Sequence, residues 1–359
     1  MNGRQLFGLT FTAVLASSSC ISGDPILDPL GEELCSLNPS LLSVDLPPDA
    51  IPALTQPTMV DPDSPDLLYL EDRDRVLGVV INGEARAYPH NILWHHEIVN
   101  DVIDGVPISV TYCPLTGSGL AFNPLVDGVQ LDLGVSGLLF ANNLVMFDRI
   151  GGDVFGPQLS RSGECAIWRD KTLELMPVQE MSWGRWRGLY PNTTVVSSET
   201  GHGRNYRVCP YGSYAELFNN QLLFPMGVDE TRSLKERVLV IRLSDTGGRG
   251  YPFGELEHLG EVGALNELVG GIPTAIFYEA RDGHVANAFD ARVGGQTLTF
   301  ESVSAGMWRD VETGSTWGID GVATSGPHQG ARLTERSDSF VVFWFAWRHF
   351  LPDGDTCLN

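Results

Sequence analysis

Short stretches of alternating hydrophobic and polar residues run through most of the chain and predict strands joined by tight turns. The clearest case is the β-branched run 76–81, which the turn Asn82-Gly83 separates from a second run at 85–88. Asn-Gly between two such runs predicts a β-hairpin. From Pro89 onward the apolar spacing changes to that of a helix, which predicts a helix over 89–100.

The rest of the chain continues this mixture of strands and short helices. We expect a short helix over 142–148. We also expect a segment over 173–191 that begins extended and becomes helical around Trp183 and Trp186. Further strands are predicted at 108–112, 119–122 and 129–135. Strands, hairpins and a few helices in this order predict the α+β fold class.

A second, fainter copy of the pattern begins at residue 237, so the chain is predicted to hold two pseudo-repeated units. Equivalent residues stay 161 to 166 positions apart, from the Arg75/Arg237 pair to the Trp186/Trp347 pair. A register held over that length is typical of duplication. We therefore expect the two units to superpose with one strand order, placing Tyr112 over Tyr278 and Asp148 over Asp310.

The cysteine, histidine and glutamate residues of the first unit that could take part in a reaction are replaced in the second unit. Glu279 stands at the place of Cys113, and Phe253, Val262 and Gly263 stand at the places of His90, His96 and Glu97. The shared Gly, Pro and Tyr positions fit backbone requirements common to both units. A thiol and imidazoles found in one unit alone indicate a functional site in that unit.

The N-terminus is predicted to be an export signal. Arg4 precedes an apolar stretch over 6–16, which is typical of a signal peptide and too short to span a bilayer. Small residues then lead to Cys20, as in bacterial lipoprotein signals, so Cys20 is the predicted lipidation site. Ordinary signal-peptidase cleavage nearby is the alternative. We expect an exported protein, either membrane-anchored through lipid or free in the periplasm or outside the cell.

The predicted domain organisation follows from these boundaries. Its parts are a signal peptide at 1–20, an extended proline-rich tether at 21–65, the first unit at 66–198, a connecting segment at 199–235 and the second, degenerate unit at 236–353.

The net charge of −22 argues against nucleic acid as a partner and against docking on anionic lipid, because both need an excess of Lys and Arg. The only membrane contact expected is therefore the lipid anchor. Export implies an oxidising compartment, where disulfides persist. Of the six cysteines, five remain if Cys20 carries lipid, so at least one thiol is unpaired within the chain. Several pairings fit, and one joins Cys35 to Cys357 and Cys165 to Cys209, leaving Cys113 free.

Cys113 lies in the most strongly patterned motif of the chain, where a strand reaches a turn containing Pro114 and Gly117. We expect the turn to expose the thiol while the strand end holds it. Thr116 makes the motif C-x-x-T, and its hydroxyl can donate to the thiolate and lower the thiol pKa. The predicted catalytic residues are Cys113, Thr116, His96 as the proton partner within about 3–5 Å, and the neighbouring Glu97.

Two other functions fit the same residues. Cys113 and His96 could hold a transition metal, since thiolate and imidazole ligands suit copper or zinc. Alternatively, Cys113 is a small buried hydrophobe, the histidines are satisfied helix residues, and the protein is a structural or interaction lipoprotein without a site. The sequence leaves these three hypotheses open, and neither a substrate nor a reaction type follows from it.

Four segments carry a resemblance to a known family. They are Gly-Glu-Ala-Arg-Ala-Tyr-Pro at 83–89, His-Glu-Ile-Val-Asn-Asp at 96–101, Thr-Tyr-Cys-Pro-Leu-Thr-Gly-Ser at 111–118 and Asn-Leu-Val-Met-Phe-Asp-Arg at 143–149. Together they resemble the DUF3179 family over roughly residues 70–350. That family is named for its unknown function, so the resemblance implies a family and no activity. It also implies that Cys, Ser or Thr can stand at the place of Thr116.

Overall fold

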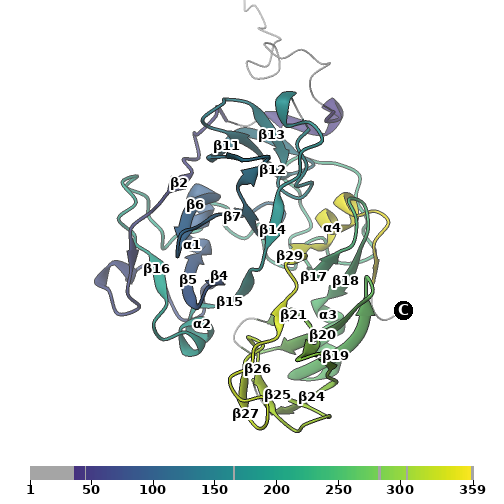
Figure 1. Cartoon of the computed structure of the whole chain (residues 1–359). Coiled ribbons are helices and arrows are strands. Elements are labelled where there is room, and N and C mark those ends of the chain that lie inside the picture. The colour runs from purple at the N-terminus through teal and green to yellow at the C-terminus, as the bar shows by residue number, and fades with distance from the viewer. Residues whose placement is uncertain (1–35, 45, 165, 282–283, 305, 357–359) are drawn as a thin grey trace, which may run out of the picture.

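The computed structural model describes residues 36–44, 46–164, 166–281, 284–304 and 306–356. Strands make up 43% of the structure and helices 11%, so the predicted α+β class is wrong and the protein is mostly β (Figure 1). The α-helices of the described residues are all short, and they are α1 (His90–His96), α2 (Trp183–Leu189), α3 (Phe253–Leu256) and α4 (Trp344–Phe350).

The predicted hairpin is confirmed. β4 (Arg75–Ile81) pairs antiparallel with β5 (Glu84–Pro89). The two turn residues between them, Asn82 and Gly83, have φ angles of 51° and 87°. Left-handed φ at both central residues is the type I′ geometry that Asn-Gly favours.

The helix predicted over 89–100 is confirmed only for its first half. α1 ends at His96, because Glu97 adopts a φ of 56° and turns the chain. The β-branched residues that follow belong to β6 (Ile98–Ile103), which pairs along its whole length with β7 (Val106–Cys113). Apolar spacing alone did not reveal this switch from helix to strand.

The helix predicted over 142–148 is wrong, because Asn143–Asp148 forms strand β12. β12 lies between β11 (Leu133–Phe140) and β13 (Val154–Pro157) and is buried along most of its length. A short strand buried on both faces has a continuous apolar run instead of alternation, so its period resembles that of a helix. The segment 173–191 is confirmed, since extended residues there precede α2.

Three strand arrangements build the first unit. They have the orders β15-β4-β5-β16-β3, β2-β6-β7-β8 with β14 beside β8, and β1-β11-β12-β13. The strands not yet bounded are β1 (Leu42–Val44), β2 (Leu54–Thr55), β3 (Met59–Val60), β8 (Ser118–Asn123), β14 (Glu174–Met176), β15 (Gln179–Ser182) and β16 (Thr194–Val196).

The second unit has the corresponding orders β29-β17-β18-β30, β19-β20-β21-β28 and β24-β25-β26-β27. Each unit also has a small two-stranded ribbon, β9 with β10 and β22 with β23. The bounds are β9 (Leu125–Val126), β10 (Val129–Gln130), β17 (Arg237–Arg242), β18 (Gly248–Pro252), β19 (Val262–Val269), β20 (Ile272–Glu279), β21 (Val285–Asp290), β22 (Arg292–Val293), β23 (Gln296–Thr297), β24 (Phe300–Ser304), β25 (Met307–Asp310), β26 (Thr316–Gly318), β27 (Ala323–Ser325), β28 (Thr334–Glu335), β29 (Ser339–Phe343) and β30 (Asp355–Thr356).

The two units share one extended sheet. Gly119 of β8 pairs with Val341 of β29, which joins strands of both units into a nine-stranded sheet. Beside this joint Arg75 and Arg237 both reach the buried carboxylate of Glu180, at 2.6 Å and 3.2 Å. Both guanidiniums also donate to the carbonyl oxygen of His284. The units therefore form one folded body.

An indole packs on a glycine in each unit. Trp186 lies so close to Gly78 that a Cβ there would meet the ring at 2.1 Å, and Gly78 faces Ala87 across the hairpin. Trp347 lies equally close to Gly250, where a Cβ would meet the ring at 2.4 Å. The room for each ring therefore depends on one missing side chain.

Two segments expected as linkers take part in the fold. The described part of the predicted tether at 21–65 supplies β1, β2 and β3, each paired with a strand of the first unit. The connecting segment 199–235 has neither helix nor strand, yet its tyrosines pack over the first unit. The predicted signal peptide at 1–20 lies outside the described residues. Within those that are described, no helix is long and apolar enough to cross a membrane.

Candidate functional site

Cys113 is the last residue of β7 and pairs with Ser118 across the turn. We expected the turn to expose its thiol, but the residue is only 1% exposed. The hydroxyl of Tyr214 in the connecting segment donates to the carbonyl oxygen of Leu115 in this turn, and that of Tyr211 donates to the carboxylate of Glu97. The segment therefore covers the turn that sequence reasoning left open to solvent.

The Cys113 sulfur lies close to the backbone of Leu144 and to Thr116. The backbone N–H of Leu144 donates to Sγ at 3.4 Å, and the hydroxyl and backbone N–H of Thr116 are close enough to lower the thiol pKa. The thiol itself donates to the carbonyl oxygen of Asn142 at 3.6 Å. The donors lower the thiol pKa, but burial and then the negative charge of Glu97 outweigh them and raise it to about 11.

Glu97 brings a carboxylate to this thiol from the sharp junction between α1 and β6. Its side chain is buried, and its Oε1 accepts a hydrogen bond from the hydroxyl of Tyr211 at 3.3 Å. Its backbone is held in place because its carbonyl oxygen accepts from the N–H of Tyr112 at 2.7 Å. A φ of 56° is strained for a residue other than glycine, and strain of this kind clusters at functional sites.

His96 is engaged elsewhere. Its Nδ1 lies 2.7 Å from the carbonyl oxygen of Pro52, and its Nε2 lies 2.7 Å from the hydroxyl of Tyr206. Burial lowers its pKa to about 4, so the ring is neutral at pH 7, with Nδ1 as donor and Nε2 as acceptor. Among the described residues no hydrogen bond links His96 to Cys113.

The residues proposed for a metal site provide too few ligands. No group of three or more His, Cys, Asp or Glu side chains within the described part of the chain could hold a metal ion. His96 would also have to give up one of its two hydrogen bonds to become a ligand. The residues named for this alternative, Cys113 and His96, therefore do not form a metal site by themselves.

Thr116 belongs to a buried polar network as well as to the thiol. Its hydroxyl contacts Ser118 at 2.8 Å and accepts from the side-chain amide of Asn143 at 3.0 Å. Gln158 closes the network through Ser118, Asn143 and Thr111. The network fixes the turn after Cys113 against β12. Asn143 lies in a segment that carries the family resemblance but was given no role, and Gln158 was missed because nothing in its local sequence marks it.

The tyrosines of the connecting segment were also missed, although tyrosine enrichment in a supposed linker was a usable signal. Tyr206 holds His96, Tyr211 holds Glu97, and the Tyr214 hydroxyl donates to the carbonyl oxygen of Leu115 at 3.1 Å. Lys235 anchors the end of the segment with its ammonium 3.6 Å from the Tyr214 ring centroid. Beneath the segment lies a cavity of about 40 Å³, lined by Glu97, Tyr211 and apolar side chains.

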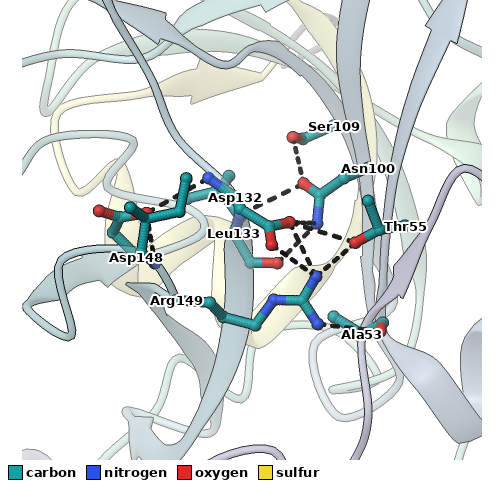
Figure 2. A network of polar contacts seen from close by, with 9 residues as sticks. Ala53, Thr55, Asn100, Ser109, Asp132, Leu133, Asp148 and Arg149 are labelled. Carbon is teal, nitrogen blue, oxygen red and sulfur yellow. Dashed lines mark hydrogen bonds and ion pairs between the residues drawn. The ribbon is translucent and has the colours of Figure 1, made fainter.

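A second polar cluster lies nearby in the first unit (Figure 2). The guanidinium of Arg149 donates to both oxygens of Asp132 at 2.8 Å, and Asn100 donates to Oδ1 of the same carboxylate at 2.9 Å. Arg149 also contacts Thr55 and the carbonyl oxygen of Ala53, which ties the N-terminal segment to the sheet.

Other shared positions make the same contacts in both units. Tyr88 and Arg86 bind the carboxylate of Asp101 at 2.8 Å and 2.7 Å. Tyr251 and Arg249 bind Glu267 at 3.1 Å and 3.3 Å. These residues therefore stabilise the hairpins. The residue at the place of Cys113 differs in role, since Glu279 forms an ion pair with Arg185 at 3.0 Å.

A family model for a protein family of unknown function, DUF3179, matches residues 48–354. The chain belongs to the DUF3179 family. No curated protein and no solved structure matches it. The segments 96–101, 111–118 and 143–149, which carried the resemblance to DUF3179, contain Glu97, Cys113 and Arg149 and so border the two clusters described above.

The remaining cysteines add little to the DUF3179 site. Cys209 is a free, half-buried thiol in the connecting segment, and its suggested partner Cys165 lies outside the described residues. Cys20, Cys35, Cys165 and Cys357 lie outside the described residues. Among the residues that are described, Cys113 is the one cysteine placed beside a buried carboxylate.

Proposed function

We propose that the first unit holds a thiol site in which Cys113 is the nucleophile and Glu97 accepts its proton. One arrangement carries the proposal: the Leu144 N–H donates to Sγ, with Thr116 close by, and the charge of a buried carboxylate acts on the thiol. A donor stabilises a thiolate, and a carboxylate that can approach the sulfur gives the proton a destination. Thr116 is proposed to lower the thiol pKa, and His96 to hold the connecting segment through Tyr206.

The resting thiol is protonated, because its pKa is raised to about 11. In the reaction Glu97 takes the proton while the sulfur forms a bond to an electrophilic carbon or sulfur, whose leaving group departs with the bonding electrons. The thiolate then interacts with donors that are already in place, so little reorganisation is needed. The cavity of about 40 Å³ beside Glu97 is not lined by Cys113, so we propose that the connecting segment moves to admit a substrate to the thiol.

The second unit supports the assignment by contrast. We infer that the units arose by duplication, which their common strand orders and their equivalent Arg–Tyr–carboxylate contacts favour. The second unit has Glu279 at the place of Cys113 and Gly263 at the place of Glu97, so it lacks both proposed reacting groups.

Alkylation kinetics can separate a reactive site from a merely buried thiol. Cys113 is left as the sole cysteine, and its rate with iodoacetamide is measured at pH 6–8 with and without Glu97→Gln. A carboxylate that accepts the proton makes the variant slower, by about tenfold or more, since general bases contribute factors of about 10² to 10⁴. Glu84→Gln, which removes a half-exposed carboxylate of β5, serves as the control and leaves the rate unchanged.

The opposite result has a clear meaning. If Glu97 only raises the thiol pKa, its removal lowers that pKa and makes alkylation faster. A faster Glu97→Gln variant, or a wild-type thiol that reacts only after denaturation, would favour the interaction lipoprotein without a site.

We further propose that the protein is exported and anchored through lipid on Cys20. The support is the order of charged, apolar and small residues before Cys20. Cys20→Ser is expected to shift the protein from the membrane fraction to the soluble fraction and to abolish the mass added by lipid. Wild-type protein found in the soluble fraction without added mass would contradict the anchor.

A further inference from the structure

A cavity of about 280 Å³ opens beside the Asp132–Arg149 pair, on the far end of β6 from Glu97. That volume is near the lower limit of about 300 Å³ for small-molecule sites. Its walls come from the N-terminal segment, the β6 and β7 strands, and the ribbon that precedes β11. The lining residues are Thr55, Gln56, Asn100, Asp101, Val102, Ile108, Pro124, Gln130, Leu131, Asp132 and Ile150.

We propose that this cavity binds a small neutral ligand rich in hydroxyl groups, such as a single sugar ring. This inference is independent of the thiol site.

The charges of the walls favour a neutral ligand. No basic side chain lines the cavity, so an anion has no counter-charge there. The two carboxylates of the lining are already compensated, because Arg86 binds Asp101 at 2.7 Å and Arg149 binds Asp132 through two hydrogen bonds of 2.8 Å. A cation would therefore gain little by entering.

The unused hydrogen-bonding groups favour hydroxyls. The side chains of Gln56 and Gln130 make no hydrogen bond within the described residues, and Oδ2 of Asp132 accepts only from Arg149. Each amide offers a donor and an acceptor, and the carboxylate offers an acceptor. A hydroxyl matches this set because it donates and accepts at once, while Val102 and Ile108 can contact the C–H face of a ring.

The second unit acts as an internal control. There the side chain of Asn266 makes two hydrogen bonds with the backbone of Phe300, as that of Asn100 does with Leu133. The backbone N–H of Val311 donates to the carbonyl oxygen of Thr299 at 2.9 Å, and the backbone N–H of Arg149 donates to that of Asp132 in the same way. The backbone is thus the same, but the side chains that replace Asp132 and Arg149 are uncharged, and Val311 is 63% exposed. The fold therefore does not require the charged pair, which occurs only beside the cavity.

Calorimetric titration of the purified protein tests the proposal, with D-glucose, D-galactose and N-acetyl-D-glucosamine as neutral probes and putrescine and inorganic phosphate as charged ones. At least one sugar is expected to bind with a Kd below about 1 mM, while putrescine and phosphate do not bind. Gln130→Ala is expected to weaken that sugar by about tenfold, and Gln296→Ala, in the matching ribbon of the second unit, leaves it unchanged.

A variant that carries residues of the second unit in the first unit is expected to fold, so it tests sugar binding separately from folding. The double variant Asp132→Thr with Arg149→Val installs the residues of the second unit and is expected to fold while losing sugar binding. Circular dichroism and the thermal transition check the fold. Failure of all three sugars to bind overturns the proposal, as does putrescine or phosphate binding in their place, or full sugar affinity in the folded double variant.

Discussion

Burial reverses the chemistry expected of Cys113. A thiol at a strand end beside a hydroxyl and an imidazole was expected to have a pKa below its ordinary value. The structure raises the pKa to about 11, because Tyr211 and Tyr214 exclude water and Glu97 adds a negative charge. The local motif placed Thr116 beside the thiol, but the Leu144 donor lies outside that motif. It could not show that a segment a hundred residues away covers the thiol.

This pKa has a consequence for alkaline stability. The folded thiol holds its proton above the ordinary value of 9.0, so between pH 9 and about 11 the folded state binds more protons and stability falls as pH rises. Cys113→Ala should remove this fall. Urea unfolding of the wild type and of Cys113→Ala at pH 8.5, 9.5 and 10.5 checks it. Parallel curves for the wild type and Cys113→Ala would contradict the raised pKa.

Lys235 is expected to make stability rise with pH, which is opposite to the effect of Cys113. Burial among Tyr214 and the aromatic side chains of β29 and α4 lowers its pKa from 10.5 to about 8. Between pH 8 and 10.5 the unfolded state therefore binds more protons, and stability rises with pH. Lys235→Met is expected to abolish this rise in urea unfolding experiments. Lys171→Met, at a more exposed ion pair, should leave the rise intact.

At the scale of elements, turn chemistry could be predicted and burial on both faces could not. Between two β-branched runs, Asn82-Gly83 favours the type I′ turn of a hairpin. The pairing of β4 with β5 could therefore be predicted from the sequence. α1 and β12 were misjudged because a short apolar run fits both periods until its neighbours are known. The Asp132–Arg149 pair escaped prediction because β11 and β12 meet only in the folded sheet.

The contact between α2 and β4 allows a sharp test. Gly78→Ala places a methyl group against the Trp186 ring in a packed core, which should lower the free energy of unfolding by about 1–3 kcal/mol. Gly188→Ala is the matched control, because its Cβ meets nothing within 4 Å. That change in α2 should raise stability by roughly 0.5–1 kcal/mol. Thermal unfolding of both variants measures these two changes in stability. Equal effects would mean that Trp186 adapts freely.

At the scale of the whole molecule, the Glu180 carboxylate joins the two units. Arg75 and Arg237 come from equivalent positions, yet both pair with this one side chain. Sequence analysis found the equivalence of the arginines, but it could not place the units face to face. The position that corresponds to Glu180 in the strand pairing is Val341, so the charge arrangement is asymmetric.

Removing this carboxylate should destabilise both units together. Glu180→Gln leaves two partly buried guanidiniums without this shared counter-charge, which is expected to lower stability by up to about 3–5 kcal/mol. The arginines lower the Glu180 pKa to about 2, so its contribution is full above the ordinary value of 4.5 and is lost as pH falls toward 2. The variant should therefore lose less stability between pH 4.5 and 2 than the wild type.

Calorimetry and acid titration check this prediction. The wild type is expected to unfold in one transition, because the nine-stranded sheet runs through both units. Glu84→Gln, which removes a half-exposed carboxylate, should change stability by less than about 1 kcal/mol. Two separate transitions in the wild type would show that the units unfold independently and that the shared carboxylate matters little.

The indoles of Trp186 and Trp347 each need a missing side chain beneath them, but on different strands. In the first unit the glycine is on β4, at Gly78 facing Ala87, and in the second it is on β18, at Gly250 facing Val240. Each cross-strand pair has one glycine and one larger residue. The glycine is on the first strand of the hairpin in the first unit and on the second strand in the second unit. Evolution of these two positions should therefore be coupled. Across family sequences that keep the tryptophan, a gain of volume on one strand should accompany a loss on the other, so that covariation marks this contact.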